Sequence, residues 1–345
     1  MIKINKDLIF SNFKRPVLIA EISGNHNGNK KRFLKLIESA YANGADLVKI
    51  QTYEPDDITL NIKNKKFKIS SGIWKNKYLW DLYKKACTPY DWHYDAFKVA
   101  KKFKKVLFSS PFSIRGVDFL EKFNTSIYKI ASFEITDYKL IDYIASKKKP
   151  IIISTGVASL QEVSKAIRLI NKYHNKVIIM HCVSNYPTKL ENTNLSNIKI
   201  LKKKFKKNII GLSDHTNHIY SSLASIPLNV AVIEKHFKID NKKTLDSDFS
   251  ILPSQLKTLK NSLVSIHKSL LAKKTDNNEF NIKHRRSLFA NLDIKKGERL
   301  TENNIVSLRP RIGICSSNYF KILDKTLKKN VKKGEPIFKN FINNY

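Results

Sequence analysis

The sequence predicts an α/β protein, a closed (β/α)8 TIM barrel followed by a small second domain. Eight apolar, β-prone runs recur along the first two thirds of the chain, with helix-like segments between them. Polar side chains follow every run at its carboxyl end, which is where the active sites of such barrels lie. The chain has 345 residues, and a barrel of this kind takes about 250. A smaller second domain therefore fits in the remainder.

The expected strands are rich in β-branched residues and are bounded by turn signals. They span residues 17–22, 47–51, 106–110, 127–131, 151–155, 177–182, 209–213 and 232–237. Helical segments between them include residues 30–43, 91–103, 159–173 and 217–228. An open doubly wound sheet, which also alternates strands and helices, is the main alternative. No Gly-x-Gly-x-x-Gly motif follows the first strand, which weakens the nucleotide-binding version of that alternative.

The composition predicts a globular protein, with 42% hydrophobic and 27% charged residues. No run approaches the roughly 18 apolar residues of a membrane span, and the first residues lack the apolar core of a signal peptide. We therefore expect a cytoplasmic protein with no membrane partner. The three cysteines, Cys87, Cys182 and Cys315, have unrelated spacings, so neither a disulfide framework nor a cysteine-based zinc site is indicated.

The net charge of +35 is large. Its lysines are spread along helix-like segments such as 98–105 and 201–207, with apolar residues at helical spacing between them, which is typical of solvated outer faces. A cationic protein attracts anionic, phosphorylated substrates. The alternative from another class is a basic scaffold that binds RNA or another anion. It would group basic residues around exposed aromatics, and because no such motif occurs we expect no nucleic-acid partner.

Two histidines end neighbouring expected strands, in Gly211-Leu-Ser-Asp-His215 and Val232-Ile-Glu-Lys-His236. Because side chains two residues apart on a strand point to the same face, His215 should lie on the same face as Ser213, and His236 on the same face as Glu234. Neutral imidazoles on a rigid scaffold can hold a divalent cation, with carboxylate or water completing the shell. The alternative is that each histidine bonds a backbone carbonyl at its strand end.

Lysines within two expected strands are the most informative signal for function in the sequence. A lysine inside a barrel is costly unless it meets an anion or forms a Schiff base. Lys49 and Lys129, together with nearby serines, could supply donors for a phosphate and a carboxylate. These serines are Ser110, Ser132, Ser154, Ser184 and Ser213. Glu21 and Glu234 could balance the charge and act as acid or base. An outward-pointing lysine and a Schiff-base aldolase remain the alternatives.

Two further segments complete the organisation. More than fifty residues separate the second and third strands, and their aromatic side chains suggest a lid or wall over the barrel mouth. After a polar stretch, short apolar runs and two Lys-Lys-Gly-Glu sequences indicate a compact domain of short strands. We assign the barrel to residues 1–272, a linker to 273–282 and the small domain to 283–345.

Together these motifs resemble the sialic acid synthase family, whose members condense phosphoenolpyruvate with an amino-sugar aldehyde. The matching segments are 21–27, 49–53, 109–112, 128–137, 154–156, 181–186, 211–216 and 234–237. The insertion before Trp92 looks most like that of the pseudaminic acid synthases, which use 2,4-diacetamido-2,4,6-trideoxy-altrose. The N-acetylneuraminate and legionaminate synthases are the alternatives within the family.

The tail resembles the antifreeze-like (SAF) domain that ends these synthases. In the family this domain reaches across a domain-swapped homodimer and places an arginine over the partner's sugar site. Arg309 matches that arginine best, with Arg311 as the second choice. This chain has Arg-Pro-Arg-Ile-Gly where relatives often have Arg-Pro-Gly, so the local turn is expected to differ.

The resemblance also implies roles for individual residues. His215 and His236 would bind a divalent metal, Mn²⁺ or Mg²⁺. The residues around phosphoenolpyruvate would be Lys49, Ser110, Lys129, Ser132, Ser154, Ser184 and Ser213. Those facing the sugar and the reacting centre would be Glu21, Gln51, Tyr186 and Asp246. This chain departs from the family pattern at two places. Ser184 stands where neuraminate synthases typically have Asn, although Ser suits the pseudaminate type, and Leu245-Asp-Ser-Asp248 replaces the usual Gly-Pro-Asp.

The implied reaction joins C3 of phosphoenolpyruvate to C1 of the open-chain aldehyde, which the metal polarises as a Lewis acid. Water captures the positive charge that develops at C2, and phosphate leaves by C–O cleavage. Glu21 is the first choice for handling the proton and Glu234 the second, with His236 completing the catalytic set. Holding two substrates together would supply much of the rate.

Overall fold

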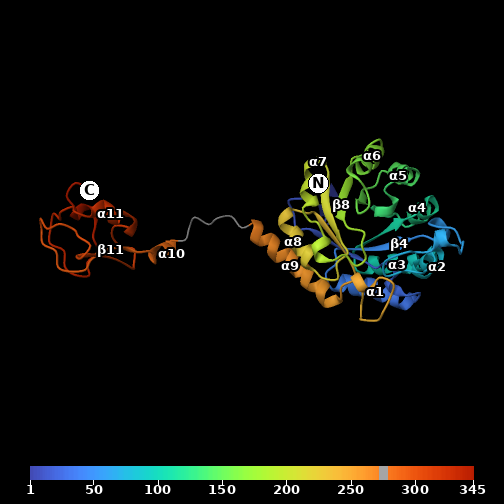
Figure 1. Ribbon diagram of the computed structural model, residues 1–345, viewed down its shortest axis with the longest axis horizontal. Helices are drawn as coiled ribbons and strands as arrows, with labels where there is room; N and C mark the ends of the chain where they lie inside the picture. Colours follow the sequence, from blue (N-terminus) through green and yellow to red (C-terminus); the bar gives the residue numbers. More distant parts are fainter. Residues whose placement is uncertain (272–278) are drawn as a thin grey trace. The chain divides into compact units, whose positions relative to one another are not determined.

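The computed structural model describes residues 1–271 and 279–345. It forms two compact units, Met1–Leu271 and Ala272–Tyr345 (Figure 1). Of the linker expected at 273–282, residues 273–278 lie outside the described residues, and residues 279–282 belong to a short helix, α10 (Glu279–Lys283). Within the described ranges, no helix is both long and apolar enough to cross a membrane.

The first unit is a closed barrel of parallel strands in the order β10-β3-β4-β5-β6-β7-β8-β9. The strands are β3 (Val17–Glu21), β4 (Leu47–Thr52), β5 (Val106–Pro111), β6 (Tyr128–Ile130), β7 (Ile151–Ser154), β8 (Val177–Cys182), β9 (Ile209–Asp214) and β10 (Val232–His236). Strand β10 pairs with β3 from Val232↔Val17 to His236↔Glu21, and this pairing closes the sheet. The predicted barrel is confirmed, and the open doubly wound sheet is excluded.

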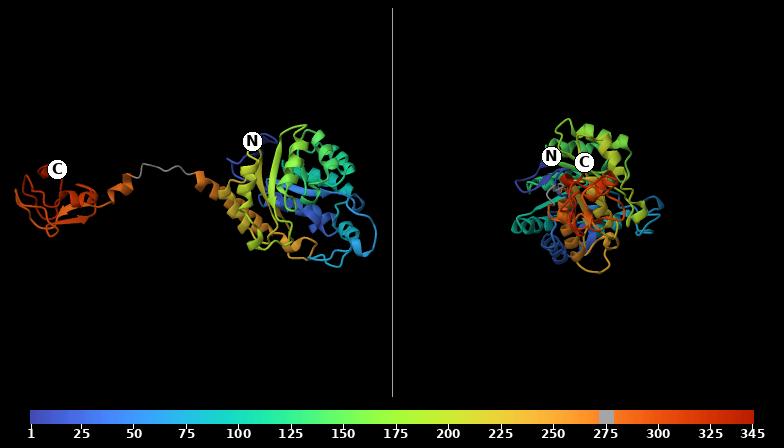
Figure 2. Two further views of the ribbon diagram at one scale, coloured as in Figure 1. Left: turned by 45° about the horizontal axis from the view of Figure 1, so that its top comes forward. Right: turned by 90° about the vertical axis from the view of Figure 1, so that its left-hand side faces the viewer.

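Helices surround the strands of this unit (Figure 2). They are α1 (Lys30–Ala42), α2 (Leu79–Ala86), α3 (Tyr90–Lys102), α4 (Ile114–Glu121), α5 (Tyr138–Ser146), α6 (Leu160–Ile170), α7 (Asn197–Lys204), α8 (Tyr220–Ser225) and α9 (Pro253–Leu271). Helix α8 is shorter than the segment expected at 217–228. It ends at Ser225 and continues as a single 3-10 turn, Ile226–Leu228, because Pro227 has no backbone N–H with which to continue the α-helical hydrogen bonds.

The inward positions of the strands change from apolar to polar towards the carboxyl ends. Ile19 is followed by Glu21, and Leu47 by Lys49, two residues later along each strand. The apolar members join one buried cluster at the amino-terminal end, where the hairpin of β1 (Ile2–Lys3) and β2 (Ile9–Phe10) adds Ile2 and Phe10. This hairpin was not predicted. The polar members are left at the opposite end, the mouth of the barrel.

The second unit contains the antiparallel pair β11 (Ser287–Ala290) and β12 (Ile305–Leu308), in the register Ser287↔Leu308. It also holds α10 and α11 (Tyr319–Ile322). Its own core includes Leu288, Leu300 and Ile337, all fully buried. The predicted compact domain of short strands is confirmed.

Candidate active site

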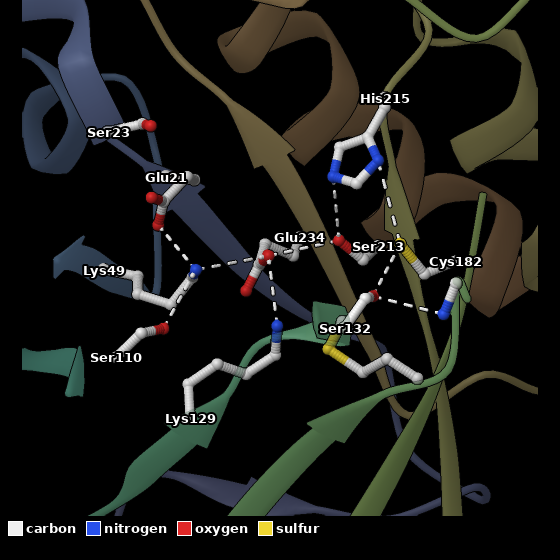
Figure 3. A network of polar contacts seen from close by, with 12 residues as sticks. Glu21, Ser23, Lys49, Ser110, Lys129, Ser132, Cys182, Ser213, His215 and Glu234 are labelled. Atoms are coloured by element: carbon white, nitrogen blue, oxygen red, sulfur yellow. Dashed lines mark hydrogen bonds and ion pairs between the residues drawn. The ribbon is translucent and has the colours of Figure 1, made fainter. Parts of the chain in front are cut away.

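Two lysines and two glutamates meet inside the mouth of the barrel (Figure 3). Lys49 Nζ lies 2.9 Å from Glu21 Oε2 and 3.5 Å from Glu234 Oε1. Lys129 Nζ lies 3.6 Å from the same oxygen of Glu234. All four side chains are buried. Both lysines therefore point inward, and the alternative of an outward lysine is wrong.

Burial and charge separate the proton affinities of this group. Burial raises the pKa of Glu21, with repulsion from Glu234 adding to the effect and Lys49 opposing it. Burial would also raise the pKa of Glu234, but Lys129 and Lys49 outweigh it and lower that pKa. Burial lowers the pKa of Lys129 despite its neighbour Glu234. The site therefore pairs a carboxyl whose proton affinity is raised, Glu21, with one whose proton affinity is lowered, Glu234.

The five predicted serines lie on the strands and loops around these lysines. Ser110 Oγ is 3.5 Å from Lys49 Nζ, and Ser213 donates to Glu234 Oε1 over 3.1 Å. Ser132 Oγ accepts from the backbone N–H of Gly156 over 3.1 Å. The hydroxyls of Ser154 and Ser184 are buried and, among the described residues, without a hydrogen-bond partner. Because an unpaired buried hydroxyl is costly, these two are suited to receive a ligand.

Gly156 lies against this group of hydroxyls. A Cβ at this position would come within 2.2 Å of Ser184 Oγ and 3.0 Å of Ser132 Oγ. The absence of a side chain therefore keeps the space between the two hydroxyls open.

We expect Gly156→Ala to raise the KM for an anion bound at these hydroxyls by at least about tenfold. The melting temperature should change little, because a serine hydroxyl can rotate away from the new methyl group. Steady-state kinetics together with thermal unfolding would check this. Gly211→Ala is the control, since its Cβ would come within 2.4 Å of Val232 Cγ1 in the barrel wall and should lower stability instead. An unchanged KM in Gly156→Ala would contradict the expectation.

The two histidines lie side by side at the ends of β9 and β10, with ring centroids 5.3 Å apart. His215 Nδ1 donates to the carbonyl oxygen of Val183 over 2.8 Å, so the ring's lone pair is on Nε2, which lies 3.4 Å from Ser213 Oγ. His236 Nδ1 is buried without a hydrogen-bond partner among the described residues. Burial and the nearby His215 hold the pKa of His236 well below its usual value, so this imidazole is neutral and available as a ligand.

This pair fits a divalent metal held by two protein nitrogens. Within residues 1–271 and 279–345, no group of three or more His, Cys, Asp or Glu side chains is arranged to hold a metal ion. The remaining ligands would therefore be water or substrate oxygens, as in catalytic sites that keep positions open. The donor set of two imidazoles suits several divalent ions.

A chain of hydrogen bonds leads from Glu21 to the other predicted polar residues. Gln51 Nε2 donates to Glu21 Oε1 over 3.0 Å and to Ser23 Oγ over 3.1 Å. Asp246 is buried, is bonded by Ser23, and accepts from the backbone N–H of Gly24 over 2.9 Å. Burial raises the pKa of Asp246. These groups form a polar wall beside Glu21.

Aromatic rings form another wall of the mouth. The ring of Tyr186 lies 4.5 Å from that of His215 and 5.0 Å from Phe249. Trp74, from the long insertion, packs 5.8 Å from Tyr186 and donates its indole N–H to Leu245 O over 3.3 Å. The insertion thus contributes to the wall over the mouth, as its aromatic content predicted.

Cys182 was interpreted only as a free thiol, and it is one of the residues that the sequence reasoning missed. Its Sγ lies 3.7 Å from His215 Nδ1 and 3.6 Å from Ser132 Oγ. Burial would raise its pKa, but His215 outweighs this and lowers it to about 7. The signal was available, because Cys182 follows two residues after Met180 on the inward face of β8.

Glu134 is the second missed residue. It stands just after β6, five residues beyond Lys129, and its Oε2 is buried without a hydrogen-bond partner among the described residues. Burial raises its pKa to about 7, with Lys129 opposing. Its place at a strand end was the signal that could have identified it.

The raised pKa of Glu134 makes the stability of the ligand-free protein depend on pH. The folded state favours the neutral carboxyl, so this contribution is fully present below the unfolded pKa of 4.5 and is lost as pH rises through about 7. We expect Glu134→Gln to be more stable than the parent at pH 8, by on the order of 2 kcal/mol, and the gain to shrink towards pH 5. Denaturant unfolding at both pH values would check this. The exposed Glu38→Gln variant is the control, and a pH-independent difference for Glu134→Gln would contradict the expectation.

Arg309 and Arg311 belong to the second unit, where both are exposed. Arg309 lines a hollow of about 400 Å³ within that unit, together with Arg285 and Arg286. The peptide bond between Arg309 and Pro310 is cis. The other predicted site residues all lie in the barrel unit.

Comparisons with known proteins agree with this arrangement. The model of the NeuB family matches residues 36–275, and the model of the SAF domain matches residues 285–343. The pseudaminic acid synthase of Campylobacter jejuni is 39% identical over 333 residues, which cover 95% of this chain and 97% of that protein. The pseudaminic acid synthase of Helicobacter pylori is 39% identical over 331 residues, covering 93% and 96%. The N,N'-diacetyllegionaminic acid synthase of Campylobacter jejuni is 35% identical, covering 94% and 99%.

Solved structures show the same relationship. The N-acetylneuraminic acid (sialic acid) synthetase of Leptospira borgpetersenii, solved with citrate, superposes with a TM-score of 0.71 at 27% identity, covering 80% of this chain and 92% of that one. A truncated 3-deoxy-D-arabino-heptulosonate 7-phosphate synthase of Thermotoga maritima shares the fold, with a TM-score of 0.57 at 13% identity. The family model spans more than half of the chain and the curated relatives cover nearly all of it, so this protein belongs to the NeuB family of sialic acid synthases and carries a C-terminal SAF domain.

Proposed function

We propose that the chain condenses phosphoenolpyruvate with 2,4-diacetamido-2,4,6-trideoxy-β-L-altropyranose in a metal-dependent reaction, to give pseudaminic acid and phosphate. One observation carries the reaction type: the mouth of the barrel holds two buried lysines together with buried serine hydroxyls that have no hydrogen-bond partner among the described residues. The sugar follows from the relatives, because two proteins named pseudaminic acid synthase are 39% identical to this chain, against 35% for a legionaminic acid synthase. The reaction takes place in the cytoplasm.

The lysines and serines bind phosphoenolpyruvate, which carries a phosphate and a carboxylate. Among the described residues Lys129 has a single carboxylate partner within 4 Å, Glu234 at 3.6 Å, so its ammonium has capacity left for an anion of the substrate. The unpaired hydroxyls of Ser154 and Ser184, with Ser110, Ser132 and Ser213, donate to the remaining oxygens. Lys49 bridges Glu21 and Glu234 and places the second positive charge beside the reacting carbons.

The reaction requires one carbon–carbon bond to form and one carbon–oxygen bond to break. C3 of phosphoenolpyruvate bonds to C1 of the aldehyde, whose oxygen takes up a proton. A water molecule adds to C2 and loses a proton, and the C2–O bond to phosphate then breaks. Glu21, whose pKa burial raises, can hold the proton that the aldehyde oxygen needs. Glu234 remains ionised and steadies the positive charge that develops at C2.

His215 and His236 hold the divalent ion, Mn²⁺ or Mg²⁺, that the family relationship implies. When bound, the ion acts as a Lewis acid on the sugar aldehyde. Gln51, Tyr186 and Asp246 orient the sugar from the two walls of the mouth. The contacts of Gln51 with Glu21 keep the sugar-binding and proton-handling groups in one hydrogen-bonded chain.

The proposal extends to a homodimer in which Arg309 of one subunit serves the active site of the other. Its support is the family resemblance and the grouping of Arg309 with Arg285 and Arg286 around one hollow. We expect Arg309→Ala and Lys49→Met to be inactive separately. Mixing and refolding them together should restore up to about a quarter of the activity in mixed dimers. If the mixture stayed inactive while mixed dimers formed, the arginine would act within its own chain or not at all.

The experiment that tests the function is phosphate release from phosphoenolpyruvate with Mn²⁺, with a chelator as control. The diacetamido-trideoxy-altrose is compared with N-acetylmannosamine and with the precursor of legionaminic acid. Chelator-sensitive release with the altrose alone is the expected result. Release only with another sugar would overturn the choice of sugar, and trapping of substrate on Lys49 or Lys129 by borohydride would favour a Schiff-base aldolase.

A further inference from the structure

We propose that the buried ion pair of Lys235 and Asp214, outside the barrel, is a positioning pair that fixes His215 for metal binding. The inference rests on the proposed function, since it takes His215 and His236 as the metal ligands. Neither Lys235 nor Asp214 points into the active site.

The two residues face each other across neighbouring strands. Lys235 of β10 is in register with Asp214 of β9, and Lys235 Nζ lies 3.1 Å from Asp214 Oδ2. Each is next in sequence to an inward-pointing residue, Glu234 and Ser213 respectively. Because side chains alternate along a strand, Lys235 and Asp214 occupy the outer surface of the barrel. Both side chains are at most 1% exposed.

Asp214 directly precedes His215, and the pair bonds the backbone of Thr216, which directly follows it. Lys235 Nζ donates to the carbonyl oxygen of Thr216 and, over 3.0 Å, to its hydroxyl. Asp214 Oδ1 accepts from the backbone N–H of Thr216 over 2.9 Å. Asp214 Oδ2 accepts from Ser222 over 2.6 Å, which ties the turn to α8. The residues before and after His215 are therefore held from the outside.

Other contacts fix the rest of His215. Its backbone carbonyl accepts from the N–H of Thr188 over 3.0 Å, and its Nδ1 donates to Val183 O. The second contact sets the tautomer and the plane of the ring, as outer partners of metal-binding histidines do. The position of the Cα depends instead on the backbone bonds, that of Thr188 to His215 and those of Lys235 and Asp214 to Thr216. Together these contacts specify where Nε2 points.

Stability alone is a weak explanation for this pair. Removing two charges from water is costly, and replacing a buried ion pair by well-packed apolar residues often leaves the stability of a protein unchanged or raises it. A metal site, in contrast, needs its ligands held to within about 0.5 Å of the productive geometry. A rigid ion pair that includes the residue before a ligand and bonds the backbone of the residue after it meets that need.

The test is the double variant Asp214→Asn/Lys235→Met. It removes both charges together, and the amide can still bond Thr216 N and Ser222, so no charge is left buried alone. We expect Mn²⁺ affinity, measured by titration calorimetry and by the EPR signal of free Mn²⁺, to fall about 10- to 100-fold. At saturating Mn²⁺, kcat should fall while the KM for phosphoenolpyruvate stays unchanged.

The matched control is Asp46→Asn/Lys260→Met. In this partly buried pair Lys260 Nζ lies 2.5 Å from Asp46 Oδ1. Asp46 also accepts from the backbone N–H of Leu18, near the start of β3, so the pair is at the opposite end of the barrel. Its variant should lose stability but keep the Mn²⁺ affinity of the parent. An unchanged Mn²⁺ affinity in Asp214→Asn/Lys235→Met would overturn the positioning proposal. Absence of Mn²⁺ binding by the parent would instead overturn the metal site of the proposed function.

A second variant keeps the proposal testable if the double variant does not fold. Ser222→Ala removes one hydroxyl, the one that Asp214 Oδ2 accepts from, and changes no charge. It should weaken Mn²⁺ binding several-fold with little change in melting temperature. Parent-like Mn²⁺ affinity in this variant would count against the proposal.

Discussion

Lys129→Met is expected to lower kcat/KM for phosphoenolpyruvate by at least about a thousandfold. Lys129 is fully inside the barrel, and burial lowers its pKa, so its charge is maintained at a cost. An anionic substrate repays that cost through a charge-assisted hydrogen bond in a site shielded from water. Methionine fills a similar volume but leaves the substrate anion without its partner. Steady-state phosphate release at varied phosphoenolpyruvate would measure the loss.

Lys149→Met is the matched control. Lys149 Nζ pairs with Glu121 Oε1 over 2.6 Å, and both side chains are partly exposed. The same substitution there should leave kcat/KM within about twofold of the parent, because exposed ion pairs contribute little. Equal losses in the two variants would mean that Lys129 acts through folding and not through the substrate.

His236→Ala is expected to reduce turnover by at least about a thousandfold and to remove high-affinity Mn²⁺ binding. His236 is one of only two imidazoles at the site, and no cluster of three or more metal-binding side chains occurs in the described parts of the chain. The loss of one nitrogen therefore removes half of the protein's ligands. Residual turnover should also be insensitive to a chelator.

His181→Gln is the control for that experiment. His181 is buried on β8, next to β9, but its Nε2 contacts Thr193 O over 2.8 Å on the outer side. Its variant should keep the Mn²⁺ affinity and the chelator sensitivity of the parent. If His236→Ala kept normal metal dependence and turnover, the assignment of the metal ligands would be wrong.

Much of the fold was predictable because its signals are local. All eight strands lie within one residue of their predicted bounds, since each is an apolar run between turn signals. The N-terminal hairpin was missed because Ile2–Lys3 and Ile9–Phe10 are too short to show a period. Their pairing is stabilised by burial against the end of the barrel, which no local pattern records.

The candidate site was predictable to a similar degree and for a related reason. Polar residues at strand ends stand out against apolar strands, so Lys49, Lys129 and the two histidines were identified. Cys182 and Glu134 have the same placement but carried no distinctive motif. Their altered pKa values come from burial and from neighbours distant in sequence, and are therefore properties of the folded chain.

The sequence by itself determined the alternation of strands and helices, the inward parity of the site residues and the family, because these depend on residue order alone. Only the tertiary structure decided which charges meet. Glu234 is shared by Lys49 and Lys129, while its neighbour Lys235 turns outward to Asp214. Closure of the barrel brings strands that are more than 200 residues apart in sequence into register, as in His236↔Glu21. Proximity of that kind arises from packing and hydrogen bonding of the whole sheet, so it is absent from any single segment.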